Sequence, residues 1–137
     1  MSVGRAWANF DDFPLHKALG ITLVESRTGF ARICLATNST TLGGIGGGVH
    51  GGVLAAMVDI AMLAALRETF EPGDQPAGTA DLNITYLRPA LGARIYAEAE
   101  VLRKGRQLVV AEVSIIDGED RLCAKGRTLY SLRARRD

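Results

Sequence analysis

The sequence predicts an α+β domain in which an antiparallel β-sheet wraps around one long central helix. Two observations support this fold class. Residues 53–66 are apolar except for Asp59, and Pro72-Gly73 follow as a helix terminator, so a helix is expected from about residue 51 to residue 70. Two strand-like runs precede this helix and four follow it. A helix that is apolar on nearly every face needs cover on most sides, and a curled sheet provides it.

Strands are expected at residues 20–25, 30–36, 81–87, 94–102, 107–116 and 122–132. Apolar and polar side chains alternate in residues 81–87 and 94–102, whereas residues 107–116 are apolar on both faces, as expected of a central strand. The last four are joined by short links, which predicts antiparallel pairing among them. Asp117-Gly118 is expected to form a hairpin turn, and Gly126 a β-bulge. A short amphipathic helical segment is expected at residues 7–19.

Length and composition limit the functional classes. The 137 residues fit one domain, predicted to span residues 1–137. A formal net charge of +1 argues against a nucleic-acid partner. The apolar run of the helix is shorter than the roughly 18 residues that a membrane span needs, and it carries a charge. We therefore expect no membrane association.

The cysteines and histidines indicate neither disulfides nor metal ligands. Cys34 and Cys123 lie far apart in strand-like runs, so both are interpreted as buried free thiols in a reduced, cytoplasmic setting. Asp11 and Asp12 near the N-terminus argue against a signal peptide. His16 is isolated, and no metal site or cofactor is expected.

Asp59 is the first candidate for chemistry. Burying an ionised carboxylate is costly unless it is paired, and the residues three or four positions away in the helix carry no positive charge. These neighbours are Ala55, Ala56, Met62 and Leu63. Asp59 is thus either hydrogen-bonded elsewhere for structural reasons or held at a functional site.

The glycine-rich run at residues 43–52 is the second candidate. Glycine lets a ligand approach the main chain closely. The start of the helix lacks a Ser, Thr, Asp or Asn cap near Gly51, so free N–H groups suited to an oxyanion are expected there. The alternative interpretation is a flexible loop. The run does not end in Lys-Ser/Thr, so it is not a phosphate-binding loop.

Arg103-Lys104-Gly105-Arg106 is the third candidate, a tight basic turn between two strands. It is either an exposed hairpin tip or a contact for a phosphorylated carrier such as coenzyme A. The basic residues 133–136 are interpreted as a solvated end of the chain.

The order of these motifs resembles the hotdog-fold thioesterases, in particular the PaaI-like branch of acyl-CoA thioesterases from phenylacetate pathways. The resemblance rests on His50-Gly51-Gly52, on Asp59 nine residues after the histidine, and on residues 79–89, which read TADLNITYLRP. Each motif is short, but the ordered set is specific, and the resemblance covers residues 19–132.

The resemblance implies a hotdog fold, with homodimers joined edge to edge through the strand near residues 79–87 and commonly paired into tetramers. The active site would lie between subunits. It implies that Asp59 acts as nucleophile or general base and that the Gly51 N–H of the facing chain holds the oxyanion. His50 would lie near the thioester, and Thr79 would help to place the attacking water. The coenzyme A contacts implied are Gly52, Arg103, Lys104, Gly105 and Arg106.

One position departs from the family pattern. Relatives often carry Asn or Gln six residues before the histidine, where this chain has Gly44. Either another side chain such as Asn38 takes over that role, or the reaction is slower or uses a different acyl group. The walls of the acyl pocket are expected from Met57, Met62, Leu63 and the N-terminal segment.

The functional hypothesis is hydrolysis of an acyl-CoA, aromatic or of short to medium chain length, to the free acid and coenzyme A. Two alternatives stay open. One is a hotdog hydratase or dehydratase acting on an acyl-CoA or acyl-carrier protein. The other is a non-catalytic acyl-CoA binding module, for which Gly44 is an argument.

Overall fold

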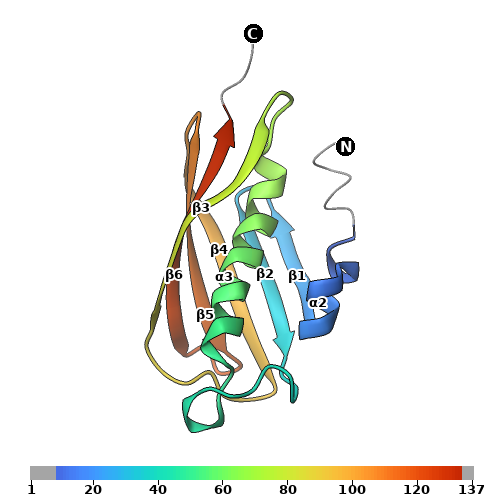
Figure 1. Cartoon of the computed structure of the whole chain (residues 1–137), viewed down its shortest axis with the longest axis vertical. Coiled ribbons are helices and arrows are strands. Elements are labelled where there is room, and N and C mark those ends of the chain that lie inside the picture. The colour runs from blue at the N-terminus through green and yellow to red at the C-terminus, as the bar shows by residue number, and fades with distance from the viewer. Residues whose placement is uncertain (1–8, 134–137) are drawn as a thin grey trace.

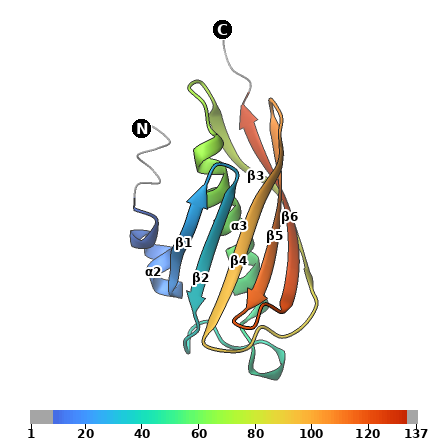
Figure 2. The same cartoon turned by 180° about the vertical axis from the view of Figure 1, so that it is seen from behind.

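A six-stranded antiparallel sheet curls around one long helix in the structure, a computed structural model that describes residues 9–133 (Figure 1). The helix is α3, Gly51–Leu66, and it lies against one face of the sheet, as Figures 1 and 2 show from opposite sides. The expected α+β class and central helix are confirmed. Residues 7–8 of the expected N-terminal segment and residues 134–136 of the basic end lie outside the described residues.

The helices and strands follow one another in the expected order. The strands are β1 Ile21–Arg27, β2 Phe30–Ala36, β3 Gln75–Tyr86, β4 Arg94–Lys104, β5 Leu108–Asp117 and β6 Leu122–Arg133. The shorter helical elements are η1 Phe10–Asp12, α2 Pro14–Leu19, η2 Ile45–Gly47 and η3 Arg67–Thr69. Helix α3 ends four residues earlier than residue 70, and η3 continues it by one tighter turn.

The strand order is β1-β2-β4-β5-β6-β3, and every neighbouring pair is antiparallel. Although β3 and β4 follow each other in the sequence, they are not neighbours, because the link at residues 87–93 crosses the end of the sheet (Figure 1). Strand β3 therefore forms one edge of the sheet. It begins six residues before the expected start at Asp81, which brings Thr79 into the strand.

Small side chains on the inner face of the sheet let the helix approach closely. Ala31, Ala97, Ala99 and Ala111 are fully buried beneath α3, among the larger side chains of the core. Strand β4 alternates between this buried face and an outer face that is at least partly exposed over most of its length, as its period-two pattern predicted, and β2 and β5 alternate in the same way.

Gly126 does not form the expected β-bulge. It pairs in regular register with Val113 on one side and Ile84 on the other. A Cβ atom at Gly126 would lie 2.8 and 2.9 Å from the two methyl carbons of Val58. The glycine is required because α3 packs directly onto the backbone of β6 at this point.

The sheet covers only part of α3. A stripe of partly or fully exposed residues runs along the helix on the side turned away from the sheet, at Gly52, Ala55, Ala56, Asp59 and Leu63. The expectation of a helix wrapped on most sides is met, since nine of its sixteen residues are buried, and this stripe is the part left open within a single protomer. Within residues 9–133, no helix is long and apolar enough to cross a membrane.

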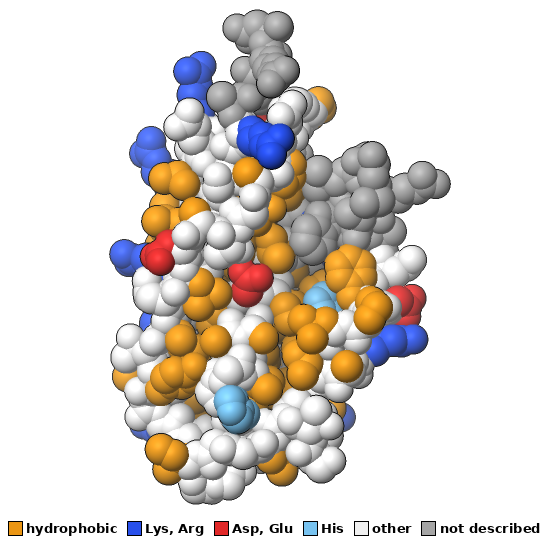
Figure 3. All heavy atoms as spheres, viewed as in Figure 1, with side chains coloured by type: hydrophobic (Ala, Val, Ile, Leu, Met, Phe, Trp, Pro, Cys, Tyr) orange, Lys and Arg blue, Asp and Glu red, His pale blue; other side chains and the backbone are white. Residues whose placement is uncertain are grey.

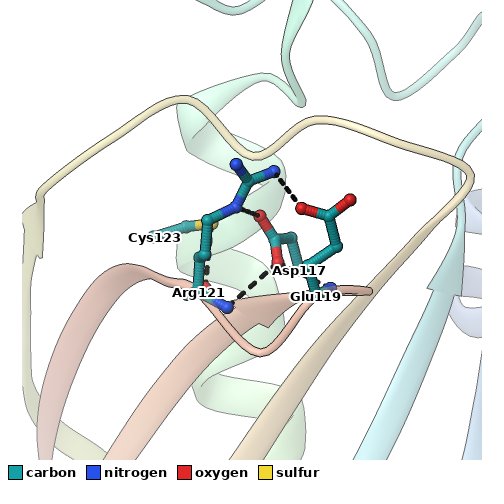
Figure 4. Close-up of polar contacts among 4 residues, drawn as sticks. All are labelled: Asp117, Glu119, Arg121 and Cys123. Atoms are coloured by element: carbon teal, nitrogen blue, oxygen red, sulfur yellow. Dashed lines mark hydrogen bonds and ion pairs between the residues drawn. The ribbon is translucent and has the colours of Figure 1, made fainter.

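The turn between β5 and β6 is held by a buried carboxylate (Figure 4). Asp117 is 2% exposed and accepts hydrogen bonds from the backbone N–H groups of Glu119 and Arg121, at 2.9 and 3.0 Å, and from Arg121 Nε at 2.8 Å. These donors, the Arg121 N–H first among them, lower the pKa of Asp117 below its usual range. The hairpin turn expected here is confirmed.

Candidate active site

Asp59 lies midway along α3 and is bonded to the neighbouring edge strand. Thr79 Oγ1 on β3 donates a hydrogen bond to Asp59 Oδ1 at 2.7 Å. The carboxylate is partly exposed within one protomer, and no Lys or Arg of residues 9–133 forms an ion pair with it. Its second oxygen is therefore available to a water molecule or a substrate. Asp59 and Thr79, which belong to separate sequence motifs, are therefore in direct contact.

Irregular pairing of β3 directs Thr79 toward the helix. The register between β3 and β6 shifts between Pro76 and Gly78 and again between Thr79 and Asp81. Gly78 has a φ of 113°, a conformation that favours glycine. Bulges at sheet edges and next to active sites re-aim side chains, and these two flank the hydroxyl that contacts Asp59.

Tyr130 on β6 also belongs to the surroundings of Asp59, although the sequence analysis did not select it. It pairs with Thr79 in the sheet register and is 6% exposed. Burial raises the pKa of Tyr130, and the negative charge of Asp59 raises this pKa further. The phenol therefore stays protonated beside the carboxylate.

His50 caps the first turn of α3, which corrects the expectation that this turn has no side-chain cap. His50 Nδ1 accepts a hydrogen bond from the Gly52 N–H at 2.9 Å. Because Nδ1 is the acceptor, the neutral imidazole carries its proton on Nε2. Gly52, expected to contact coenzyme A, thus has its N–H engaged by His50.

Tyr86 fixes the same turn from the other side. Its hydroxyl donates to the Gly51 carbonyl oxygen at 2.6 Å, and a Cβ at Gly51 would lie 3.2 Å from the tyrosine ring. Within residues 9–133, the Gly51 N–H donates to no carbonyl or side chain. One unpaired backbone donor therefore remains at the helix start, held in place by two side chains.

The glycine run forms an ordered hairpin rather than an irregular loop. Leu42 and Val49 form an isolated antiparallel bridge, and the N–H groups of Gly43 and Gly44 both donate to the Gly48 carbonyl. A Cβ at Gly44 would lie 2.5 Å from the Val49 carbonyl oxygen, so this backbone admits no side chain there. The chain cannot place Asn or Gln at position 44 without a different hairpin.

Asn38 does not replace the missing Asn or Gln. Its Nδ2 donates to the carbonyls of Leu19 and Ala36 at 2.9 and 3.0 Å, and its Oδ1 accepts from the Thr40 N–H at 2.9 Å. The side chain joins α2, β2 and the following loop, so its role is structural.

The basic turn lies at the opposite end of α3 from His50. Lys104 Nζ donates to the Thr69 carbonyl at 2.8 Å and pairs with Asp74 Oδ2 at 2.7 Å. The Gly105 N–H donates to the Leu108 carbonyl, while Arg103 and Arg106 are exposed. Within one protomer, the turn is therefore separated from the helix start by the length of α3.

An open pocket of about 520 Å³ adjoins the helix start. Its lining includes His50, Gly51, Tyr86 and part of the glycine hairpin. Met57 and Met62, expected as walls of the acyl pocket, are fully buried in the core and do not line it. Figure 3 shows hydrophobic side chains spread over this face of the molecule, with only isolated charged groups among them.

Comparison with known proteins identifies the family. The family model for the thioesterase superfamily matches residues 46–124, which include the second half of the glycine hairpin, α3, β3, β4 and β5. The chain therefore belongs to the thioesterase superfamily, and its fold is the hotdog fold that the motif order implied.

Individual relatives match over most of the chain. A Halobacterium salinarum protein named as a candidate esterase is 36% identical over 113 residues, 80% of this chain and 74% of its own. The medium/long-chain acyl-CoA thioesterase YigI of Salmonella typhimurium is 30% identical over 130 residues, 85% of this chain and 84% of its own. The structure is similar to that of the Escherichia coli PaaI protein from the phenylacetic acid degradation operon, with a TM-score of 0.78, 25% identity and 94% of each chain covered.

Proposed function

We propose that this protein is an acyl-CoA thioesterase, which hydrolyses the thioester to a free acid and coenzyme A. The observation that carries the proposal is the Asp59 carboxylate, bonded on one side by Thr79 and free of any ion pair within residues 9–133. The similarity to YigI, whose name states this activity, supports it.

In the proposed reaction, Asp59 attacks the thioester carbonyl or removes a proton from a water molecule that attacks it. Thr79 positions the carboxylate or that water. The negative charge that develops on the carbonyl oxygen is stabilised by the Gly51 N–H, and His50 Nε2–H supplies a second donor on the same side. A single backbone donor of this kind is worth a factor of about 10² to 10³ in rate. The thiolate of coenzyme A leaves and takes up a proton. Where Asp59 is the nucleophile, a water molecule then hydrolyses the acyl-aspartate anhydride, which releases the free acid and restores the carboxylate.

The distance between Asp59 and Gly51 supports a site shared by two subunits. The two residues are eight positions apart in α3, which is about 12 Å along the helix axis and about 80° around it. One carbonyl group has to lie about 3 Å from both groups. Asp59 of one chain and Gly51 of another would meet this requirement if the exposed stripe of α3 and the edge of β3 face a second copy.

We therefore propose a homodimer joined through β3, with pairing into tetramers as a further step. Arg103 and Arg106 are retained as proposed contacts of the nucleotide end of coenzyme A, since both are exposed. Lys104 is a weaker candidate for this contact with coenzyme A, because Asp74 and Thr69 already engage its ammonium group. A cytoplasmic location is proposed from the two free cysteines.

The test is thiol release from a panel of acyl-CoAs. Asp59→Asn and Asp59→Ala are expected to abolish turnover, because no other carboxylate bonds to Thr79 within the described chain. Thr79→Ala is expected to lower the rate less. The unfolding midpoint of each variant is the control for folding.

Two results would contradict the proposal. Undiminished thiol release by Asp59→Asn would remove the residue from the mechanism. Hydration of an enoyl-CoA without hydrolysis of the saturated thioester would assign the chain to the hydratases instead.

A further inference from the structure

The residues that line the pocket at the start of α3 indicate which part of a substrate it binds. We propose that it receives the acyl chain of a medium-length aliphatic acyl-CoA, with Ile45 and Leu87 setting the preferred chain length. This inference rests on the function proposed above and assigns the acyl group of the same site. The pocket borders Gly51, so a thioester carbonyl placed on the Gly51 N–H would direct its acyl chain into it.

The side chains that line the pocket are mostly apolar. They come from three segments, the tip of the glycine hairpin, the first turns of α3 and the link that follows β3, with Ile45, Leu54, Leu87 and Pro89 as the main contributors. Arg88 is the one charged residue of the lining, and it is exposed to solvent. Such walls stabilise an apolar group through burial of its surface.

Most backbone donors of the walls are already used within the protein. In the glycine hairpin, the N–H groups of Gly43 and Gly44 donate to the Gly48 carbonyl, that of Val49 to Ala90 and that of His50 to Thr41. In the link after β3, the N–H groups of Leu87 and Arg88 both donate to the Cys123 carbonyl. The pantetheine arm of coenzyme A carries amides that need partners, so this pocket suits the acyl chain better than the carrier.

Two of the three polar side chains of the lining, those of Tyr86 and His50, are engaged as well, while Arg88 is exposed to solvent. The Tyr86 hydroxyl donates to the Gly51 carbonyl, and His50 Nδ1 accepts from Gly52. A hydroxyl group on an aromatic acyl group would lose its water and gain no buried partner, which disfavours it. The polar groups of the site are thus directed at the thioester rather than at its acyl substituent.

The volume favours a chain longer than a benzoyl group. A methylene group needs about the room of a water molecule, whose share of the liquid is about 30 Å³, so about 520 Å³ holds a chain of about eight to twelve carbons with space to spare. At the same volume per carbon, the seven carbons of a benzoyl group would fill about two fifths of the pocket and a twelve-carbon chain about two thirds. Each added methylene therefore gains burial until the chain reaches the end of the pocket.

Ile45 and Leu87 are suited to control this length. Ile45 is 90% exposed at the tip of the hairpin, and Leu87 is 54% exposed. Neither side chain belongs to the buried core, so both are free to contact an acyl chain. Replacing them is not expected to unfold the protein.

The test measures binding and turnover separately. Alkyl-CoA thioethers, which cannot be hydrolysed, are titrated by calorimetry over chains of four to twelve carbons, and the matching acyl-CoAs are assayed for thiol release. Affinity and kcat/KM are expected to rise about threefold to fourfold per methylene up to the medium range, mainly through KM. Hydroxybenzoyl-CoA is expected to be a poorer substrate than octanoyl-CoA.

Ile45→Ser and Leu87→Ser are expected to reduce affinity for the decyl thioether about three- to tenfold, with a smaller loss for the butyl thioether. Val24→Ser, on the exposed edge strand β1, is the matched control and should change neither. Length-dependent binding without hydrolysis would support the pocket and overturn the proposed enzyme. Hydrolysis with no dependence on length, or unaltered length dependence in both serine variants, would overturn the pocket and leave the enzyme intact.

Discussion

At the scale of single residues, the candidate site consists of groups that hold one another in place. Thr79 fixes one oxygen of Asp59, while His50 and Tyr86 fix the peptide between Gly51 and Gly52 from opposite sides. Preorganised donors stabilise a developing charge more than mobile ones, because they need no reorganisation during the reaction. The precision of the site therefore depends on hydrogen bonds within the protein.

Tyr86→Phe tests this dependence. The phenylalanine keeps the ring over Gly51 but loses the hydrogen bond to its carbonyl, so kcat is expected to fall up to about tenfold with little change in KM. Tyr96→Phe is the control, because Tyr96 lies on the outer face of the sheet beneath Arg32. Steady-state kinetics on one acyl-CoA measure both kcat and KM. An unchanged kcat would mean that Tyr86 does not orient the helix start.

The sequence identified part of this site, and the reason for the rest is physical. Asp59, His50 and Gly51 stand out because a charge or a glycine run interrupts an apolar pattern. Tyr86 and Tyr130 look like ordinary strand residues, since their contacts with α3 exist only after the sheet has formed. The cap on the helix was missed because histidine is not among the residues that usually supply one.

At the scale of elements, close packing of α3 on the sheet explains the glycine in β6. Gly126→Ala would push a Cβ into the methyl groups of Val58 and is expected to lower the free energy of unfolding by about 1 to 3 kcal/mol. In a Val58→Ala background, the same substitution should cost less, because the obstructing methyl groups are absent. Urea unfolding of the wild type, the two single variants and the double variant gives the coupling free energy between the two positions. Equal losses of stability from Gly126→Ala with and without the Val58 methyl groups would refute the contact.

The β5–β6 turn predicts a loss of stability in acid. Hydrogen bonds lower the pKa of Asp117 in the folded state, so the stabilisation is present above the unfolded pKa of about 3.9 and is lost as the pH falls through the lower folded pKa. The stability difference between the wild type and Asp117→Asn should therefore shrink as the pH falls from 5 to 3. Urea unfolding at each pH measures it, with Asp120→Asn in the same turn as control. A difference independent of pH would contradict this account of the turn.

The order of elements was predictable from periodicity, but their arrangement in the sheet was less so. Strand-like runs located all six strands, and alternation was clearest in β4, whose inner face is buried. The early start of β3 was missed because residues 75–80 carry no alternation of apolar and polar side chains. The separation of β3 from β4 depends on a link across the sheet end, which no local pattern encodes.

At the scale of the whole molecule, the single protomer leaves a helix stripe and a sheet edge uncovered, and both lie on the side of Asp59. A site completed by a second chain accounts for these features together with the distance between Asp59 and Gly51. It also predicts that two inactive variants can restore each other, since each site would take one residue from each chain.

Subunit complementation tests this claim most directly. Gly51→Pro removes the N–H donor and adds a Cβ that would lie 3.2 Å from the Tyr86 ring. Proline is otherwise favoured at the first helical position, and the φ and ψ of His50, −56° and 134°, suit a residue before proline. Gly51→Ala, which adds the same Cβ but keeps the N–H, is the matched control. Asp59→Asn and Gly51→Pro are each expected to be inactive, while an equal mixture refolded together should recover about a quarter of the wild-type kcat, since half of the dimers are mixed and each holds one intact site. A mixture as inactive as its two components would contradict a site shared between chains.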